Sequence, residues 1–171
     1  KHFPGHGGIK EDSHIAEPID IRSHNELMDT DLKPFIELKD KLSAVMTAHI
    51  TYPDIDNVCV SFSEIWLKNI LQNNIGFNGV IFSDDLTMKG AGNISMDEKA
   101  IRALNAGCDM VLVCNDYKEA NSVINRFEKE DIDLNSRIGM MQKTKTFNWE
   151  DLADNPRVIE TKQIIKTLGE I

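Results

Sequence analysis

Residues 79–88 read Gly-Val-Ile-Phe-Ser-Asp-Asp-Leu-Thr-Met, an apolar run that ends in two adjacent carboxylates, Asp84 and Asp85. Residues 44–50 and 110–114 form two further short apolar runs. None of the three runs alternates cleanly between apolar and polar side chains, and amphipathic stretches separate them. This pattern is typical of parallel strands that are covered on both faces and connected by helices.

Helices are expected between and after these strands. Ser61-x-x-Glu64 and Ser95-x-x-Glu98 each have the form of a capping box, which predicts helices over residues 61–76 and 95–107. Further helices are expected over residues 117–127 and 156–168, and residues 143–154 read as a loop or surface element anchored by Trp149 and Leu152. The apolar side chains expected to face the core are Ile65, Leu67, Ile70, Leu71, Ala100, Ile101, Ala103, Leu104, Val123, Ile124, Phe127, Leu134, Ile138, Met141, Ile159, Ile164, Ile165 and Leu168.

Three strand–helix units, with the tail of another strand near Lys1, make about half of a (β/α)8 barrel, which usually takes about 250 residues. We therefore predict an α/β fold that is one half of a TIM-type barrel. On this interpretation the chain is incomplete, and its natural amino terminus lies outside the given sequence.

Composition narrows the class of function. The 171 residues are 41% hydrophobic and 27% charged, as expected of a soluble domain, and the net charge of −9 argues against nucleic-acid or anionic-membrane partners. No apolar run is long enough to span a bilayer. The three cysteines, Cys59, Cys108 and Cys114, lie in apolar surroundings and favour reduced thiols, so we expect a cytoplasmic protein.

The first fourteen residues concentrate titratable groups on a segment that is poorly suited to a core. They include Lys1, His2, His6, Asp12 and His14, interspersed with glycines and a proline that predict a mobile loop leaving a strand. In the Asp-Ser-His sequence the carboxylate can accept a hydrogen bond from one ring nitrogen. The other nitrogen is then free to carry a proton to or from a substrate.

Together, this loop and residues 79–88 resemble the family-three glycoside hydrolases, specifically their bacterial β-N-acetylglucosaminidase branch. Other motifs follow in the order that the family shows: Asp31-Leu32-Lys33-Pro34-Phe35, Ala44-Val45-Met46-Thr47-Ala48-His49, Ser61-Phe62-Ser63, Trp66-Leu67, and residues 106–115. The resemblance fades after about Asp116. It implies that residues 1–171 are the C-terminal half of the catalytic barrel, from the tail of strand five through strand eight plus C-terminal helices, with the N-terminal half absent.

The resemblance also implies a role for each candidate site residue. Asp84 corresponds to the nucleophile of a retaining glycosidase, and Asp85 is interpreted as a structural hydrogen-bonding residue. His14 corresponds to the general acid/base, and Asp12 orients it, in place of the usual second carboxylic acid. Lys1 and His2 correspond to sugar-binding residues.

Four other residues near this site are given lesser roles. His6 is expected to shape the loop, and His49, at the end of a strand, is a secondary candidate for the site. Met46 and Met88 are interpreted as packing residues.

The expected reaction is retaining hydrolysis of terminal β-linked N-acetylglucosamine, a substrate consistent with muropeptides in peptidoglycan recycling, with no metal and no organic cofactor. One alternative is another β-glycosidase or a phosphorolytic enzyme of the same family. Two alternatives from other classes stay open. His2, His6, His14 and Asp12 offer ligands for Zn²⁺, and the half-barrel is alternatively an inactive interaction module. We expect the 171-residue chain alone to be nearly inactive and to pair with its missing half or with another copy.

Overall fold

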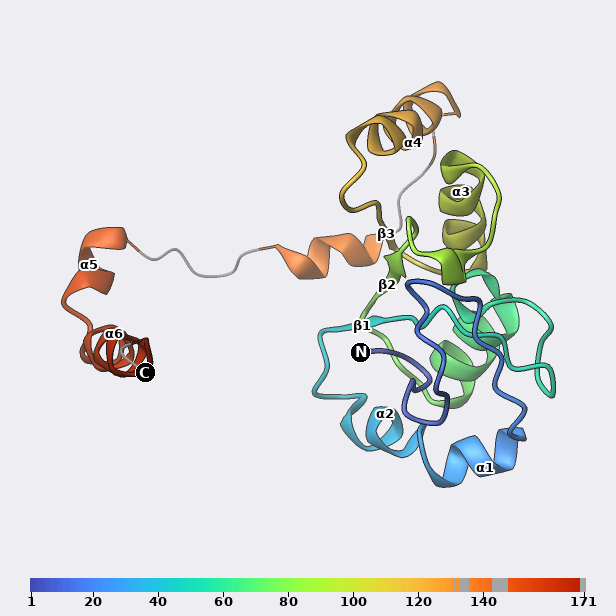
Figure 1. Ribbon diagram of the computed structural model, residues 1–171, viewed down its shortest axis with the longest axis horizontal. Helices are drawn as coiled ribbons and strands as arrows, with labels where there is room; N and C mark the ends of the chain where they lie inside the picture. The colour runs from blue at the N-terminus through green and yellow to red at the C-terminus, as the bar shows by residue number, and fades with distance from the viewer. Residues whose placement is uncertain (131, 133–135, 143–147, 170–171) are drawn as a thin grey trace. The chain divides into compact units, whose positions relative to one another are not determined.

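The computed structural model describes residues 1–130, 132, 136–142 and 148–169, which belong to two compact units, Lys1–Met141 and Gln142–Ile171. The N-terminal unit contains a parallel sheet in the order β1-β2-β3 (Figure 1). Its elements in chain order are α1 (His24–Asp29), α2 (Lys33–Leu38), β1 (Ala44–Met46), η1 (Val60–Phe62), η2 (Ile65–Asn74), β2 (Val80–Asp85), η3 (Lys89–Ala91), α3 (Met96–Ala106), β3 (Met110–Leu112), α4 (Tyr117–Glu130) and η4 (Ser136–Met141).

The sheet confirms the predicted parallel strands and extends beyond β1. Val45 pairs with Ile81 in β2, and β2 pairs in turn with β3. On the other side of β1, Phe3 forms a parallel bridge with Thr47; its N–H donates to the Met46 carbonyl at 2.7 Å. The first residues are thus the tail of a fourth parallel strand, as expected. The carboxyl ends of all four strands meet at one edge of the sheet.

The helices between the strands follow the prediction in position but differ in how they begin. Ser61 does not cap a helix; it is buried in the short 3-10 helix η1, and its hydroxyl bonds to Thr47 and His49. At the start of the next helix the Trp66 N–H donates instead to the Ser63 hydroxyl, at 3.1 Å. That helix, η2, has π-type hydrogen bonds, and α3 begins after Ser95 without a side-chain cap bond.

Two short helices, α1 and α2, were not predicted. Ser23 and Glu26 form a reciprocal capping box at the start of α1, with the Glu26 N–H donating to the Ser23 hydroxyl. Pro34 stands at the start of α2. The Ser23-x-x-Glu26 pattern is the signal in the sequence that identifies the first of these helices.

The core lies between the sheet and η2. Trp66 is fully buried there and makes edge-to-face contact with Phe3 and a tilted contact with Tyr52. A second, smaller cluster under α3 and α4 consists of Leu86, Met96, Ala100 and Val123. Ile65 and Ile124, expected to face the core, are 40% and 52% exposed, because the buried stripe of each helix is narrower than the pattern suggested.

The C-terminal unit contains α5 (Trp149–Ala153) and α6 (Pro156–Leu168). Residues 149–153 are helical, capped by Asn148, where a loop or surface element was expected. The helix from Pro156 has the predicted bounds, but its expected inward residues Ile159, Ile164, Ile165 and Leu168 are 44–65% exposed. A unit of this size is too small to bury the apolar face of a helix on its own. Leu134 lies outside the described residues, and the assignment of residues 1–171 to one domain stays a prediction.

Within the described residues, no helix combines the length and the apolar character needed to cross a membrane.

Candidate active site

The end of β2 holds the first candidate, Asp84, in a fixed position. Its Oδ1 accepts the N–H of the next residue, Asp85, at 2.9 Å, and its side chain is only 14% exposed. The other carboxylate oxygen, Oδ2, lies 3.7 Å from His2 Nε2. One oxygen of Asp84 is therefore held by the backbone, while the other faces the polar side of the sheet edge.

Asp85 points away from this position and anchors the strand end. Its Oδ1 accepts the N–H groups of Thr87 and Cys114, both at 3.0 Å, and its Oδ2 accepts the Thr87 hydroxyl at 2.7 Å. Burial alone would raise the pKa of Asp85, but these hydrogen bonds outweigh it and lower that pKa. The geometry is that of a structural carboxylate that joins the ends of β2 and β3.

His14 and Asp12 form the predicted pair on the N-terminal loop. His14 Nδ1 lies 2.8 Å from Asp12 Oδ1, which also accepts the His14 backbone N–H at 2.9 Å. A carboxylate only accepts, so Nδ1 carries the proton of this bond and Nε2 is left to exchange a proton elsewhere. The bonds from His14, first the backbone one and then the side-chain one, lower the pKa of Asp12.

The loop that carries this pair is tied to the segment that follows Asp84. The N–H groups of Gly90 and Lys89 in η3 donate to the carbonyls of Ser13 and His14, at 2.8 and 3.3 Å. A Cβ on Gly90 would lie 2.9 Å from His49 Cβ and 3.0 Å from the Ser13 carbonyl, so only glycine allows this approach. His6 Nε2 bonds to the Ser13 hydroxyl at 3.1 Å, which agrees with its expected loop-shaping role.

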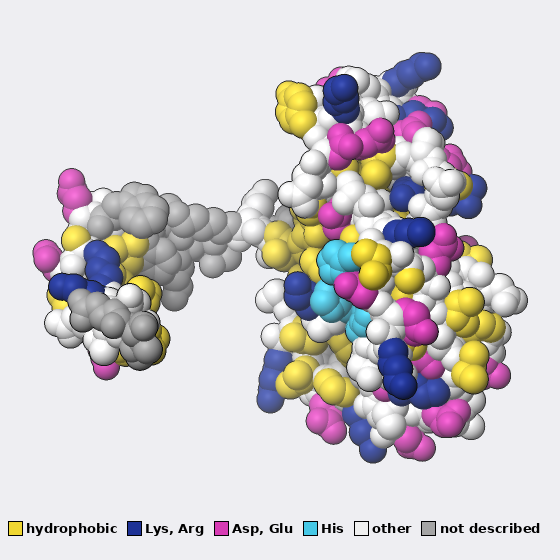
Figure 2. All heavy atoms as spheres, in the orientation of Figure 1, with side chains coloured by type: hydrophobic (Ala, Val, Ile, Leu, Met, Phe, Trp, Pro, Cys, Tyr) yellow, Lys and Arg dark blue, Asp and Glu magenta, His cyan; other side chains and the backbone are white. Residues whose placement is uncertain are grey.

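All five predicted site residues line one hollow of about 320 Å³. Its walls are formed by Lys1, His2, His6, Asp12, Ser13, His14, Asp84 and Met88. The volume is at the lower end of the roughly 300–1,000 Å³ that ligand pockets span. Figure 2 shows histidine side chains gathered on this face of the N-terminal unit beside acidic and hydrophobic ones. The geometry thus places a fixed carboxylate and a carboxylate-supported imidazole around the same space.

His2 faces this hollow as an uncharged group at neutral pH. Burial lowers its pKa, and the opposing effect of the Asp84 charge is smaller. A neutral imidazole can both donate to and accept from a sugar hydroxyl, which suits the predicted binding role.

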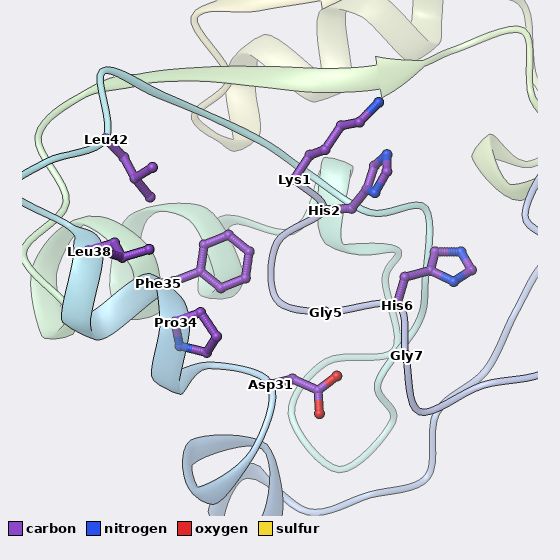
Figure 3. Close-up of a pocket in the computed structure, with 10 residues that line it drawn as sticks. All are labelled: Lys1, His2, Gly5, His6, Gly7, Asp31, Pro34, Phe35, Leu38 and Leu42. Atoms are coloured by element: carbon purple, nitrogen blue, oxygen red, sulfur yellow. The ribbon is translucent and has the colours of Figure 1, made fainter. Parts of the chain in front are cut away.

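A second hollow of about 460 Å³ adjoins the first (Figure 3). It shares Lys1, His2 and His6 with the first hollow, and α2 supplies an apolar wall that includes Phe35 and Leu38. The Phe35 ring packs edge-to-face on Phe3, with ring centroids 5.3 Å apart. Lys1 and His2 therefore lie between the two hollows.

Several supporting residues were missed by the sequence reasoning. Arg22 is paired with Asp20 at 2.7 Å and with Asp31 at 2.6 Å, and Asp31 lies against Gly5 of the loop. Gly90 lies two residues beyond the stretch 79–88, and no sequence pattern marks it. In the part of the chain that the structure describes, no group of three or more His, Cys, Asp or Glu side chains is placed to hold a metal ion, so the metal-binding alternative gains no support.

Comparison with known proteins decides the family. The model of the glycosyl hydrolase family 3 N terminal domain matches residues 1–140. The chain belongs to glycosyl hydrolase family 3. A β-hexosaminidase from Actinobacillus pleuropneumoniae serotype 3 is 42% identical over 98% of the chain and 50% of its own length. One from Idiomarina loihiensis is 52% identical over 72% of the chain and 38% of its own length.

A solved family 3 structure extends this relation to the fold. NagZ from Neisseria gonorrhoeae, in complex with N-trifluoroacetyl-D-glucosamine, is 37% identical, with a TM-score of 0.78 over 98% of this chain and 50% of that one. The predicted α/β fold, half of a (β/α)8 barrel, is confirmed by this relation. The chain spans about half or less of the length of the family 3 relatives described here.

Proposed function

We propose that the complete family 3 protein containing this chain is a retaining β-N-acetylhexosaminidase that releases terminal β-linked N-acetylglucosamine. The observation that carries the proposal is the hollow in which Asp84 meets the His14–Asp12 pair. The relatives named β-hexosaminidase, and the glucosamine derivative bound to NagZ, support the choice of sugar.

In the first step Asp84 attacks the anomeric carbon and forms a glycosyl ester, while the bond to the leaving-group oxygen breaks. His14, protonated at Nε2, gives that oxygen its proton. In the second step His14 takes a proton from water, the water oxygen attacks the same carbon, and the ester bond to Asp84 breaks. Two inversions at one carbon retain the anomeric configuration.

Other residues of the hollow hold the sugar and the proton carrier. Asp12 keeps the His14 ring in the tautomer and orientation that leave Nε2 available. Lys1 and His2 offer hydrogen bonds to the sugar hydroxyls. None of these steps needs a metal or an organic cofactor.

For the biological role we propose the release of N-acetylglucosamine from muropeptides during peptidoglycan recycling in the cytoplasm. The cysteines agree with a reducing compartment. Cys59, Cys108 and Cys114 are free, and burial raises the pKa of each thiol, for Cys59 to about 12. Detection of the complete protein in the cytosolic fraction, together with activity on isolated muropeptides, tests this role.

The activity test uses 4-nitrophenyl N-acetyl-β-glucosaminide with the complete protein, with and without phosphate. We expect phosphate-independent release of β-N-acetylglucosamine, seen by NMR before the anomers equilibrate. Release of a sugar phosphate would identify a phosphorylase instead. Release of the α-anomer first, or turnover of aryl glucosides only, would contradict the proposal.

The 171-residue chain itself should be nearly inactive. Among the described residues, the strand tail at Phe3 pairs only with β1, and β3 pairs only with β2, so both sheet edges offer unpaired backbone groups. Strong self-association or pairing with the other half of the barrel is therefore expected. A monodisperse monomer with full turnover, measured by light scattering beside the assay, would contradict this expectation.

A further inference from the structure

Behind the hollow lies a buried chain of three polar side chains, none of which lines it. Thr47, His49 and Ser61 are each 0% exposed. Thr47 Oγ1 lies 2.6 Å from Ser61 Oγ, Ser61 Oγ lies 2.9 Å from His49 Nδ1, and His49 Nε2 lies 3.0 Å from the Asp85 carbonyl oxygen. The chain thus ends on the residue that follows the proposed nucleophile.

The direction of each hydrogen bond follows from the acceptor at the end of the chain, the Asp85 carbonyl. A carbonyl oxygen only accepts, so His49 Nε2 carries a proton and donates it to Asp85. In a neutral ring Nδ1 is then an acceptor. The Ser61 hydroxyl has two acceptors within reach, Nδ1 at 2.9 Å and the Ala48 carbonyl at 3.4 Å, and the shorter contact assigns its proton to Nδ1. The Thr47 hydroxyl then donates to Ser61. Burial lowers the pKa of His49 and is the largest effect on it. The charge of Lys99 lowers this pKa further, whereas the charges of Asp84 and Asp85 raise it. The ring is therefore neutral, and the chain runs in one direction.

Neighbouring residues pack against the His49 ring and fix its orientation. It stacks on Phe62 at an interplanar angle of 24°, and Gly90 packs against its Cβ so closely that a side chain there would collide. The Cys59 sulfur lies 3.9 Å from Nδ1, on the side of the ring where Ser61 donates. Both ring nitrogens are used, as a buried polar group requires.

The residue that His49 holds determines where Asp84 lies. Asp85 is fixed at its carbonyl by His49, and its side chain is fixed by Thr87 and Cys114. On the other side of its Cα, the Asp85 N–H donates to Asp84 Oδ1 at 2.9 Å. A shift of the Asp85 backbone would move this N–H relative to Asp84 Oδ1.

We infer that His49 is a positioning residue for the nucleophile: its Nε2–H locks the Asp85 carbonyl, so that the Asp85 N–H holds Asp84 Oδ1 and Oδ2 is aimed into the hollow. This inference rests on the proposed role of Asp84. Because the ring is neutral, it positions the carboxylate without adding a positive charge that would weaken its attack. A misplacement of about 1 Å at a reacting group costs about 10²-fold in rate.

Two substitutions of similar polarity separate positioning from packing. In His49→Gln the side-chain amide nitrogen reaches the place of Nε2, whereas in His49→Asn it reaches only the place of Nδ1. With the complete protein we expect kcat of His49→Gln to stay within about threefold of wild type. We expect His49→Asn to lose about 10–10²-fold in kcat with KM within about threefold. Equal kcat values for the two variants, or a loss confined to KM, would overturn the inference.

Crystal structures of the two variants give a readout that does not depend on turnover. The hydrogen bond from the Asp85 N–H to Asp84 Oδ1 should persist in His49→Gln and be lost or displaced in His49→Asn. If this hydrogen bond persists in both variants, the positioning role is overturned, whatever the activity of the wild-type protein. An inactive wild-type protein would contradict the proposed function instead. If His49→Asn does not fold, ¹⁵N NMR of the wild-type ring decides: a proton on Nε2 supports the inference, and a proton on Nδ1 overturns it.

Discussion

Asp84 and His14 line the same hollow but are held in opposite ways. Asp84 is 14% exposed at a strand end, with one oxygen fixed by the backbone and a buried polar network behind it. His14 is 72% exposed on a glycine-rich loop, and its side chain bonds to Asp12, which is itself 59% exposed. The difference matches the two roles proposed for these residues, because a nucleophile must stay in line with one carbon whereas a proton carrier serves first a leaving group and then a water.

Removing the charge of the fixed carboxylate should have the largest effect. Asp84→Asn keeps the size of the side chain and an oxygen for the Asp85 N–H, so the fold should persist. We expect kcat to fall by at least about 10⁴-fold, because no glycosyl ester can form. Steady-state kinetics of the complete protein and thermal unfolding measure both parts. Asp85→Asn gives the matched comparison: it keeps an oxygen for the Thr87 and Cys114 N–H groups and leaves Asp84 ionised, so its loss in kcat should be far smaller than that of Asp84→Asn.

Removing the exposed imidazole should have the next largest effect. His14→Ala is expected to lower kcat by about 10²–10⁴-fold on a substrate with a poor leaving group. The loss in the first step should shrink for aryl glycosides whose leaving groups need little protonation. A variant within about threefold of wild type on a natural-type disaccharide would show that another residue carries the proton.

Asp12→Ala should be milder than His14→Ala, because Asp12 acts only through the imidazole. We expect a loss of about 10–10²-fold in the same steps, the scale of an orienting partner. Kinetics of the double variant sharpen the comparison. If Asp12 works through His14, the double variant should be no slower than His14→Ala alone, whereas additive losses would separate their roles.

The smallest expected effect is on the pH dependence of the free energy of unfolding. It comes from His49, in the buried network behind Asp84. Unfolded histidine binds a proton below about pH 6.5, whereas burial lowers the pKa of His49 in the fold. The unfolded state then binds more protons, so stability falls as pH drops below about 6.5, by at most about 1.4 kcal/mol per pH unit from this residue.

Urea unfolding at pH 7.5 and 5.5 measures this contribution. His49→Gln cannot titrate, so its stability should fall less between the two pH values than that of wild type. His14→Gln, at the exposed position, serves as the control variant. An identical pH dependence in His49→Gln and wild type would show that the ring is not held neutral.

The sequence predicted which residues line the hollow better than it predicted which residues hold them in place. Asp84, His14 and Asp12 line one hollow, because parallel strands bring their ends together at one edge of the sheet, and the roles that the motifs suggest for them stay predictions. Ser61 was misread as a helix cap, because its pattern satisfies a local rule while its hydroxyl is used by the distant Thr47 and His49. Gly90 and Arg22 act through contacts across the fold, and no local spacing encodes such contacts.

Asp84 is the residue that we propose forms a covalent bond to the sugar. Incubating the complete protein with a fluorinated N-acetylglucosaminide that forms a slowly released glycosyl-enzyme, followed by peptide mass mapping, tests it directly. We predict a single label on Asp84, lost slowly in water with return of activity. A label on Asp85, or on any other carboxylate, would contradict the assignment.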